Sequence, residues 1–196
     1  MTGDPDPEYL QPRDPGSMVV LAEPDPAWAD SFLVEAARIK TALGGKDVEV
    51  HHVGSTSVPG LAAKPILDIV LLVEDSAVEY SYAPDHQAVG YSFHVREPHW
   101  HQYRLFKGDN PRVNLHVFTS GSAEAARMLA FRDWLRNHPS DRRLYERTKR
   151  DLATRQWAYV QDYADAKSTV VNEILLRALP RVRPGRGASV RSSPQT

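Results

Sequence analysis

The sequence HVGSTSVPG at residues 52–60 leads into KPILDIVLLV at residues 64–73, and this stretch decides the predicted fold. The second segment has the length of a strand and carries apolar residues on both faces, which is typical of a central, buried strand. Asp68 alone interrupts the apolar run. Because a buried carboxylate costs free energy unless it is paired or coordinated, Asp68 is predicted to be a metal ligand or a base.

The loop before this strand has the composition of a phosphate-binding turn. Gly54 lets the backbone approach a ligand closely, and successive free N–H groups in such a turn suit phosphate oxygens. Ser55 and Thr56 add hydroxyl donors, and Lys64 adds a positive charge at the end of the loop. The alternative is an ordinary turn, with Asp68 in a salt bridge to Lys64 or to an arginine.

The segments around this stretch predict a mixed α+β fold. Apolar residues at helical spacing indicate a helix over residues 25–43, and strands are expected at 18–22, 48–53, 66–73, 91–95, 103–106 and 113–118. From Ser122 onward the periodicity is helical, with helices expected at 122–139, 141–160 and 162–179. This order favours a central mixed sheet with flanking helices and a helical C-terminal layer.

The composition is that of an ordinary globular protein, with 41% hydrophobic and 25% charged residues. One domain is expected over residues 18–179, between disordered tails at 1–17 and 180–196, the second of them basic. No apolar run has the length needed to cross a bilayer, no secretory signal precedes the domain, and cysteine is absent. These features predict a cytoplasmic protein without a membrane partner.

The charge balance bears on partners. The formal net charge of -1 gives no general case for nucleic-acid binding, so a small-molecule ligand is expected instead. The sequence contains nothing that predicts the oligomeric state.

The stretch at residues 51–73 resembles the signature of the GrpB family, which is assigned to the nucleotidyltransferase superfamily. Three later segments add to the resemblance: NLHV at residues 114–117, LAFRDWLRNHP at residues 129–139 and YADAK at residues 163–167. The resemblance extends over residues 18–178. It implies a nucleotidyltransferase-like central mixed sheet and a site for a nucleotide or another phosphate-bearing ligand.

The resemblance also implies roles for single residues. In the superfamily, a Gly-Ser pair precedes two acids on one strand and a third acid on a later strand, and these carboxylates hold two divalent metals. Residues 54–55 match the pair, and Asp68 matches the first acid and is the expected ligand of Mg²⁺. Val70 occupies the second acid position, and His116 or Asn114 the third. Since valine cannot ligate a metal, such a site relies on Asp68, substrate phosphates and water, or has lost the metal.

The catalytic candidates are Asp68, Lys64 and His116. Asn114 and His116 share one strand face and are expected to point into one cleft with Asp68. His116 is predicted to be a base or to orient Asp68, and its structural alternative is a core histidine bonded to a backbone carbonyl. The alternative for Lys64 is a solvated side chain.

Candidate binding residues extend beyond the loop. Trp100 and Arg104 are expected to line the substrate cleft or to stack on a base. The phosphate-binding candidates are His52, Gly54, Ser55, Thr56, Arg132 and Lys167. A structural alternative stands beside two of them, since Arg132 can pair with Asp133 and Lys167 with Tyr163, one turn away.

Three functions follow from these residues. The leading hypothesis is magnesium-assisted nucleotidyl or phosphoryl transfer, with phosphates held by the loop and the metal held by Asp68. The second is a non-catalytic module that binds a nucleotide, a coenzyme-A-like phosphate or another anion, which the valine at position 70 favours. The third is an enzyme of the same fold that condenses an activated acyl group with an amine.

Overall fold

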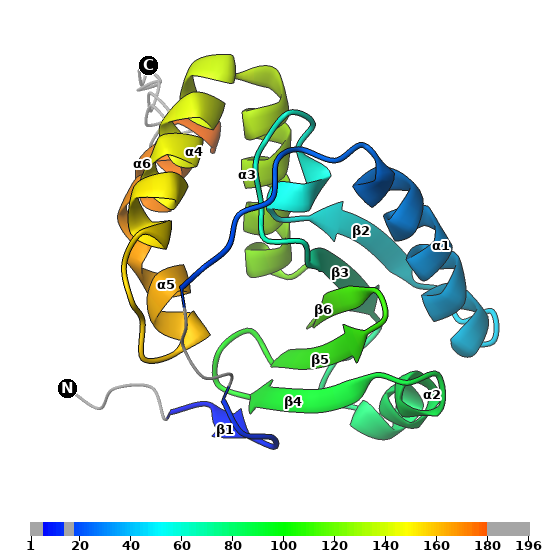
Figure 1. Ribbon diagram of the computed structural model, residues 1–196. Helices are drawn as coiled ribbons and strands as arrows, with labels where there is room; N and C mark the ends of the chain where they lie inside the picture. The colour runs from blue at the N-terminus through cyan, green and yellow to red at the C-terminus, as the bar shows by residue number, and fades with distance from the viewer. Residues whose placement is uncertain (1–5, 14–17, 180–196) are drawn as a thin grey trace, which may run out of the picture.

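The strand expected at residues 66–73 is β3 (Leu67–Val73), which lies inside a six-stranded sheet in a computed structural model of the chain (Figure 1). The structure describes residues 6–13 and 18–179, so the predicted basic tail at 180–196 lies outside the described residues. The strand order is β1-β4-β5-β6-β3-β2. Because β3 is parallel to β6 (Arg112–Thr119) and antiparallel to β2 (Glu49–Val53), the sheet is mixed, which confirms the predicted fold class.

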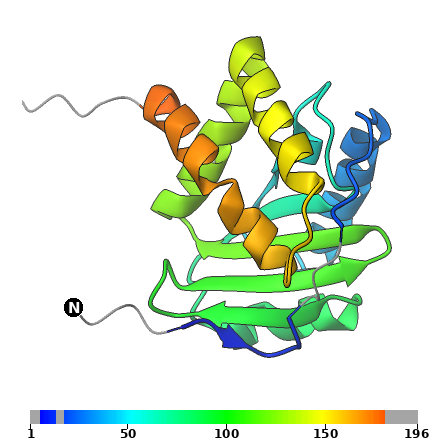
Figure 2. The same ribbon diagram turned by 60° about the vertical axis from the view of Figure 1, so that its left-hand side comes forward.

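The remaining strands and helices surround the parallel pair β3 and β6. The other strands are β1 (Glu8–Tyr9), β4 (Ser92–Glu97) and β5 (Tyr103–Asp109). The helices are α1 (Ala27–Ala42), α2 (Ala83–Ala88), α3 (Ala123–Asn137), α4 (Pro139–Ala153), α5 (Val160–Ala166) and α6 (Ser168–Ala178), and short 3₁₀ turns span Ser55–Ser57 and Glu79–Ser81. Figure 2 shows α3 to α6 standing together on one side of the sheet as the predicted C-terminal helical layer.

Alternation along β3 divides its side chains between two environments. Ile69 and Leu71 are buried in the apolar core that α1 and α2 form with the sheet. Val70 and Leu72 point to the other face and pack against Phe118 and α3. Each such buried side chain contributes about 1.5–3 kcal/mol to stability. Asp68 belongs to the second face, and the core therefore fixes the side of the sheet on which the carboxylate lies.

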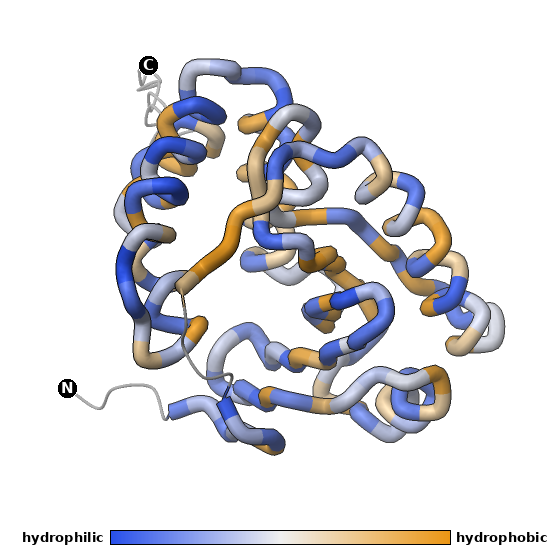
Figure 3. Tube along the Cα trace, viewed as in Figure 1, coloured by the Kyte–Doolittle hydropathy of each residue, from blue (hydrophilic) through white to orange (hydrophobic). Residues whose placement is uncertain are grey.

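The segment 18–22 is not the strand that was predicted. It makes one isolated bridge, in which Ala22 and Ala63 exchange backbone hydrogen bonds of 2.8 and 3.0 Å. Figure 3 shows this apolar segment passing between the C-terminal helices and the rest of the molecule. Met18 and Val20 are 63% and 75% exposed, so the segment belongs neither to the sheet nor to the core.

Two predicted helices end differently from expectation. The helix expected at 141–160 ends at Ala153, where the Trp157 indole donates a hydrogen bond of 3.1 Å to the Leu152 carbonyl. A new helix, α5, begins after Tyr159, whose backbone N–H donates to Asp162 at 2.9 Å. The helix expected at 162–179 is divided at Lys167 into α5 and α6.

The segment predicted to be a disordered N-terminal tail contains an ordered part. Glu8–Tyr9 pair with β4, and Leu10 donates a backbone hydrogen bond of 2.9 Å to His94. Arg96 forms an ion pair of 2.7 Å with Glu8. The tail prediction is therefore wrong for these residues. Within the described ranges, no helix is long and apolar enough to cross a membrane.

Candidate functional site

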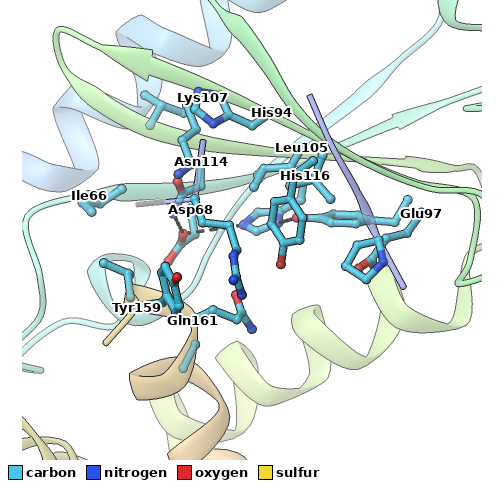
Figure 4. A pocket seen from close by; sticks show the side chains of 18 of the residues that line it. Ile66, Asp68, His94, Glu97, Leu105, Lys107, Asn114, His116, Tyr159 and Gln161 are labelled. Atoms are coloured by element: carbon cyan, nitrogen blue, oxygen red, sulfur yellow. Dashed lines mark hydrogen bonds and ion pairs between the residues drawn. The ribbon is translucent and has the colours of Figure 1, made fainter. Parts of the chain in front are cut away.

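A cavity of about 1170 Å³ lies between the Asp68 face of the sheet and the C-terminal helices (Figure 4). Its walls come from the loop after β2, from β3 to β6, from α3, α4 and α5, and from the N-terminal segment. The predicted site residues that line it are Ser55, Thr56, Lys64, Asp68, Trp100, His116 and Lys167. The structure thus brings together, in one hollow, residues that are far apart in the sequence.

Gly54 lies directly against Asp68. Its backbone has φ +66°, a conformation that favours glycine, and a Cβ added there would lie 2.2 Å from Asp68 Oδ2. The chain then enters the 3₁₀ turn of residues 55–57, which the Ser57 hydroxyl holds by donating to the Gly54 carbonyl at 2.6 Å. The glycine is therefore required both by its conformation and by the carboxylate beside it.

Asp68 is less buried than the sequence predicts, because 30% of its side chain is exposed, and it lines the cavity. Asn114 Nδ2 donates a hydrogen bond of 2.9 Å to Asp68 Oδ1, and His116 Nε2 lies 3.6 Å from the same oxygen. Figure 4 shows the three side chains converging from neighbouring strands. Burial raises the pKa of Asp68, but His116, Asn114 and the charge of Lys167 outweigh it and hold this pKa below its ordinary value.

The two ring nitrogens of His116 face different partners. Tyr103 Oη lies 2.8 Å from Nδ1, and burial raises the pKa of Tyr103 well above its ordinary value. When the phenol donates to Nδ1, the imidazole proton is on Nε2, the nitrogen that lies 3.6 Å from Asp68 Oδ1. Of the two roles predicted for His116, this geometry favours orienting Asp68, since a base needs a free lone pair on Nε2.

Val70 is fully buried among the apolar residues under α3. In the register of β3 and β6, Asp68 lies opposite Asn114, and Val70 lies opposite His116. The second acid position of the superfamily pattern is therefore part of the hydrophobic core, while an amide and an imidazole occupy the third position.

Lys149 of α4 is a site residue that the sequence reasoning missed. Its side chain is 2% exposed, and Nζ donates to Ser55 Oγ at 3.1 Å and also to the Ala62 carbonyl. Burial, and next the charge of Lys167, lower the pKa of Lys149 to about 7. A sequence signal existed, because Tyr145, Lys149 and Leu152 share the buried stripe of one helix.

Lys64 and Lys167 both lie near the Tyr163 ring. Their Nζ atoms are 5.9 and 4.7 Å from the ring centroid, respectively. Burial lowers the pKa of Lys167, and the charge of Asp68 acts in the opposite direction. Tyr163 Oη is buried and has no hydrogen-bond partner among the described residues, so the tyrosine presents an unsatisfied hydroxyl group at the cavity wall.

His52 does not line the cavity, although it was predicted to bind phosphate. Alternation along β2 places its ring on the α1 face of the sheet, stacked on Phe32 at 4.7 Å. Its Nε2 lies 3.0 Å from Thr56 Oγ1, and burial lowers its pKa to about 4. His52 therefore supports the loop from behind as a neutral side chain.

Arg132 does not reach the cavity either. Its guanidinium donates to the His52 carbonyl at 3.0 Å and pairs with Asp133 at 2.7 Å. Arg136, one turn further along α3, donates two hydrogen bonds of 3.0 and 2.7 Å to the Ser57 carbonyl. The two arginines therefore donate to the backbone of the loop, and the prediction that Arg132 binds phosphate is wrong.

Two adjacent side chains of β5 lie on opposite faces of the sheet. Tyr103 points into the cavity, whereas Arg104 points to the other face, is 4% exposed and pairs with Glu79, so its predicted place in the cleft is wrong. Trp100 does line the cavity, with 39% of its surface exposed and its ring edge-to-face with Tyr103 at 5.4 Å. The stacking surface expected from the sequence is therefore present, without the arginine.

A family model described as GrpB protein matches residues 18–177 of the chain. The UPF0157 protein BH1888 of Halalkalibacterium halodurans is 56% identical over 169 residues, which are 86% of this chain and 86% of that protein. The crystal structure of the conserved protein GrpB from Enterococcus faecalis has 29% sequence identity and a TM-score of 0.68. The similarity covers 81% of this chain and 96% of the Enterococcus chain, so the mixed sheet is shared with it.

A longer protein also contains a similar segment. The dephospho-CoA kinase of Mycolicibacterium paratuberculosis is 29% identical over 186 residues. The match covers 82% of this chain but 46% of the kinase, so more than half of that protein has no counterpart in the match.

Proposed function

The chain belongs to the GrpB family, and from that premise we propose that its cavity binds a nucleotide or a related phosphate-bearing ligand. The observation that carries the proposal is the position of Lys149. Its buried ammonium donates to the neutral oxygens of Ser55 and Ala62 and lies 4.9 Å from the centroid of the Tyr145 ring, but it forms no ion pair with a carboxylate among the described residues. A buried positive charge is stabilised by an anion, and the Ser55 hydroxyl beside it is a suitable second contact for a phosphate oxygen.

The size and lining of the cavity support a ligand larger than phosphate alone. At about 1170 Å³, it is larger than ordinary small-molecule sites, which hold about 300–1,000 Å³. Lysines line it beside Ser55, and the exposed face of Trp100 offers a surface for a flat ring. A nucleotide would fit both features of the cavity, with its phosphates at the lysines and its base stacked on Trp100.

The choice of ligands to test follows from a relative. A protein named dephospho-CoA kinase contains a segment similar to this chain. Coenzyme A and dephospho-CoA combine an adenine ring with phosphates, which is the chemistry that the cavity offers. We therefore include both with the nucleoside triphosphates in the ligand panel.

The proposal is tested by thermal shift on the purified full chain. ATP, GTP, coenzyme A and dephospho-CoA are compared with adenosine, which lacks phosphate. We expect one of the phosphate-bearing ligands to raise the Tm, adenosine to leave it unchanged, and the Ser55→Ala variant to lose the response. Ser140→Ala, at an exposed position of α4, is the matched control. The proposal fails if no ligand raises the Tm, or if adenosine raises it equally.

Nucleotidyl or phosphoryl transfer is the second candidate, and Asp68 is the observation that favours it. Its carboxylate is held in the ionised form and is partly exposed in the cavity, where it can accept a proton from an acceptor hydroxyl. The Asp68→Asn variant is then expected to fold and to lose turnover of any substrate that the panel identifies. Full turnover in that variant would exclude the mechanism.

A further inference from the structure

We infer that this cavity binds its phosphate ligand without a divalent cation, and that Lys149 and Lys167 supply the positive charge that metal ions supply elsewhere in the superfamily. The inference rests on the proposed function, because it names the partner of the phosphates in the same site. It departs from the magnesium site expected from the family resemblance.

The surroundings of Asp68 do not fit a metal ligand. Oδ1 accepts a hydrogen bond from Asn114, and His116 Nε2 lies 3.6 Å from the same oxygen. Oδ2 lies so close to Gly54 that no side chain fits between them. A cation bound to Asp68 would have to displace these donors from the carboxylate. It would also lie beside the amide NH2 of Asn114, where a metal site needs an oxygen ligand.

The other acid positions cannot complete a metal site. Val70 is in the apolar core and Asn114 is committed to Asp68. Glu124 lines the cavity, but its carboxylate is paired with Arg127 at 2.7 Å. Within residues 6–13 and 18–179, no group of three or more histidines, aspartates and glutamates could hold a metal ion.

Three lysines line the cavity together with Ser55 and Asp68. These are Lys64, Lys149 and Lys167, and carboxylates line the rest of the cavity, namely Asp6, Glu8, Glu97, Asp109, Glu124 and Asp165. Repulsion by the charge of Lys167 adds to burial in lowering the pKa of Lys149. A phosphate between them removes that repulsion, whereas a divalent cation adds to it.

The test is isothermal titration of the full chain with ATP and with inorganic tripolyphosphate, in EDTA and in excess magnesium. A lysine site prefers the free triphosphate to its magnesium complex, which carries less negative charge. We therefore expect magnesium to leave the Kd unchanged or to raise it. Lys149→Met is expected to raise the Kd about tenfold or more by removing a charge-assisted contact. Lys40→Met, at an exposed position of α1, should leave it unchanged.

Asp68→Asn provides an independent test of whether a metal ion contributes to binding, because it removes the carboxylate and leaves the lysines unchanged. In a lysine site, loss of the carboxylate leaves the Kd in EDTA unchanged or lowers it, since a negative charge is removed. The inference is overturned if magnesium lowers the Kd about tenfold or more and Asp68→Asn abolishes that gain. If neither probe binds under any condition, the proposed function itself is wrong, which is a different result from metal-dependent binding.

Discussion

Gly54 and Asp68 constrain each other, and this pair defines the site at the level of single residues. In Gly54→Ala, the new methyl group would meet Asp68 Oδ2 at 2.2 Å in a backbone conformation that alanine disfavours. We expect a loss of unfolding free energy of about 3 kcal/mol or more, the sum of strain and a displaced hydrogen-bonded carboxylate. Urea unfolding measures it.

Gly60→Ala is the matched control. Gly60 has φ +75° but no atom within 4 Å of an added Cβ. The alanine variant is therefore expected to lose about 1 kcal/mol of unfolding free energy through backbone strain alone. Equal losses in the two variants would show that the contact with Asp68 does not matter.

Lys149 makes stability and ligand binding depend on pH in opposite directions. Its pKa is about 7 in the folded chain and 10.5 ordinarily, so between these values the unfolded chain binds the extra proton and stability rises with pH. The slope approaches about 1.4 kcal/mol per pH unit. A phosphate ligand needs the charged lysine, so its affinity falls as pH rises above 7.

Comparison with Lys149→Met isolates this effect from other titrating groups. The charges that act on Lys149 come from α4 itself, from the loop between α5 and α6, and from β3, namely Glu146, Arg150, Lys167 and Asp68. Urea unfolding at pH 7 and pH 9 should show the wild type gaining stability relative to the variant. An unchanged difference would mean that Lys149 titrates at its ordinary pKa.

At the level of elements, α3 holds the loop in place through arginines. Arg136→Met removes two hydrogen bonds to the Ser57 carbonyl, and we expect a loss of about 1–2 kcal/mol and faster hydrogen exchange over residues 54–60. Arg143→Met, at an exposed position of α4, is the control. Similar exchange in both variants would show that α3 does not order the loop.

The elements also show which parts of the site were predictable. Asp68 and Ser55 stand in a local pattern, so the sequence located them. The incorrect prediction that Arg104 lines the cleft was avoidable, since alternation along β5 places Arg104 and Tyr103 on opposite faces of the sheet. The hydrogen bonds from Arg136 to the Ser57 carbonyl were not predictable, because no sequence pattern indicates which distant backbone carbonyl a side chain contacts.

For the whole molecule, the mixed sheet and the C-terminal helices were predicted because their periodicities are long and regular. Lys149 was missed for a physical reason. In an Arg- and Lys-rich helix a lysine is expected to be solvated. Lys149 shares a helix face with Tyr145 and Leu152, and the packing of α4 over the loop places it beside Ser55. The ordered N-terminal segment depends on pairing with β4, which lies about ninety residues away in sequence.

The most direct test of phosphate binding is a crystal structure of the chain with tripolyphosphate. We predict a phosphate group within hydrogen-bond distance of Ser55 Oγ and Lys149 Nζ, with no metal ion between it and Asp68. A phosphate bound elsewhere, or one bridged to Asp68 by a cation, would contradict this assignment.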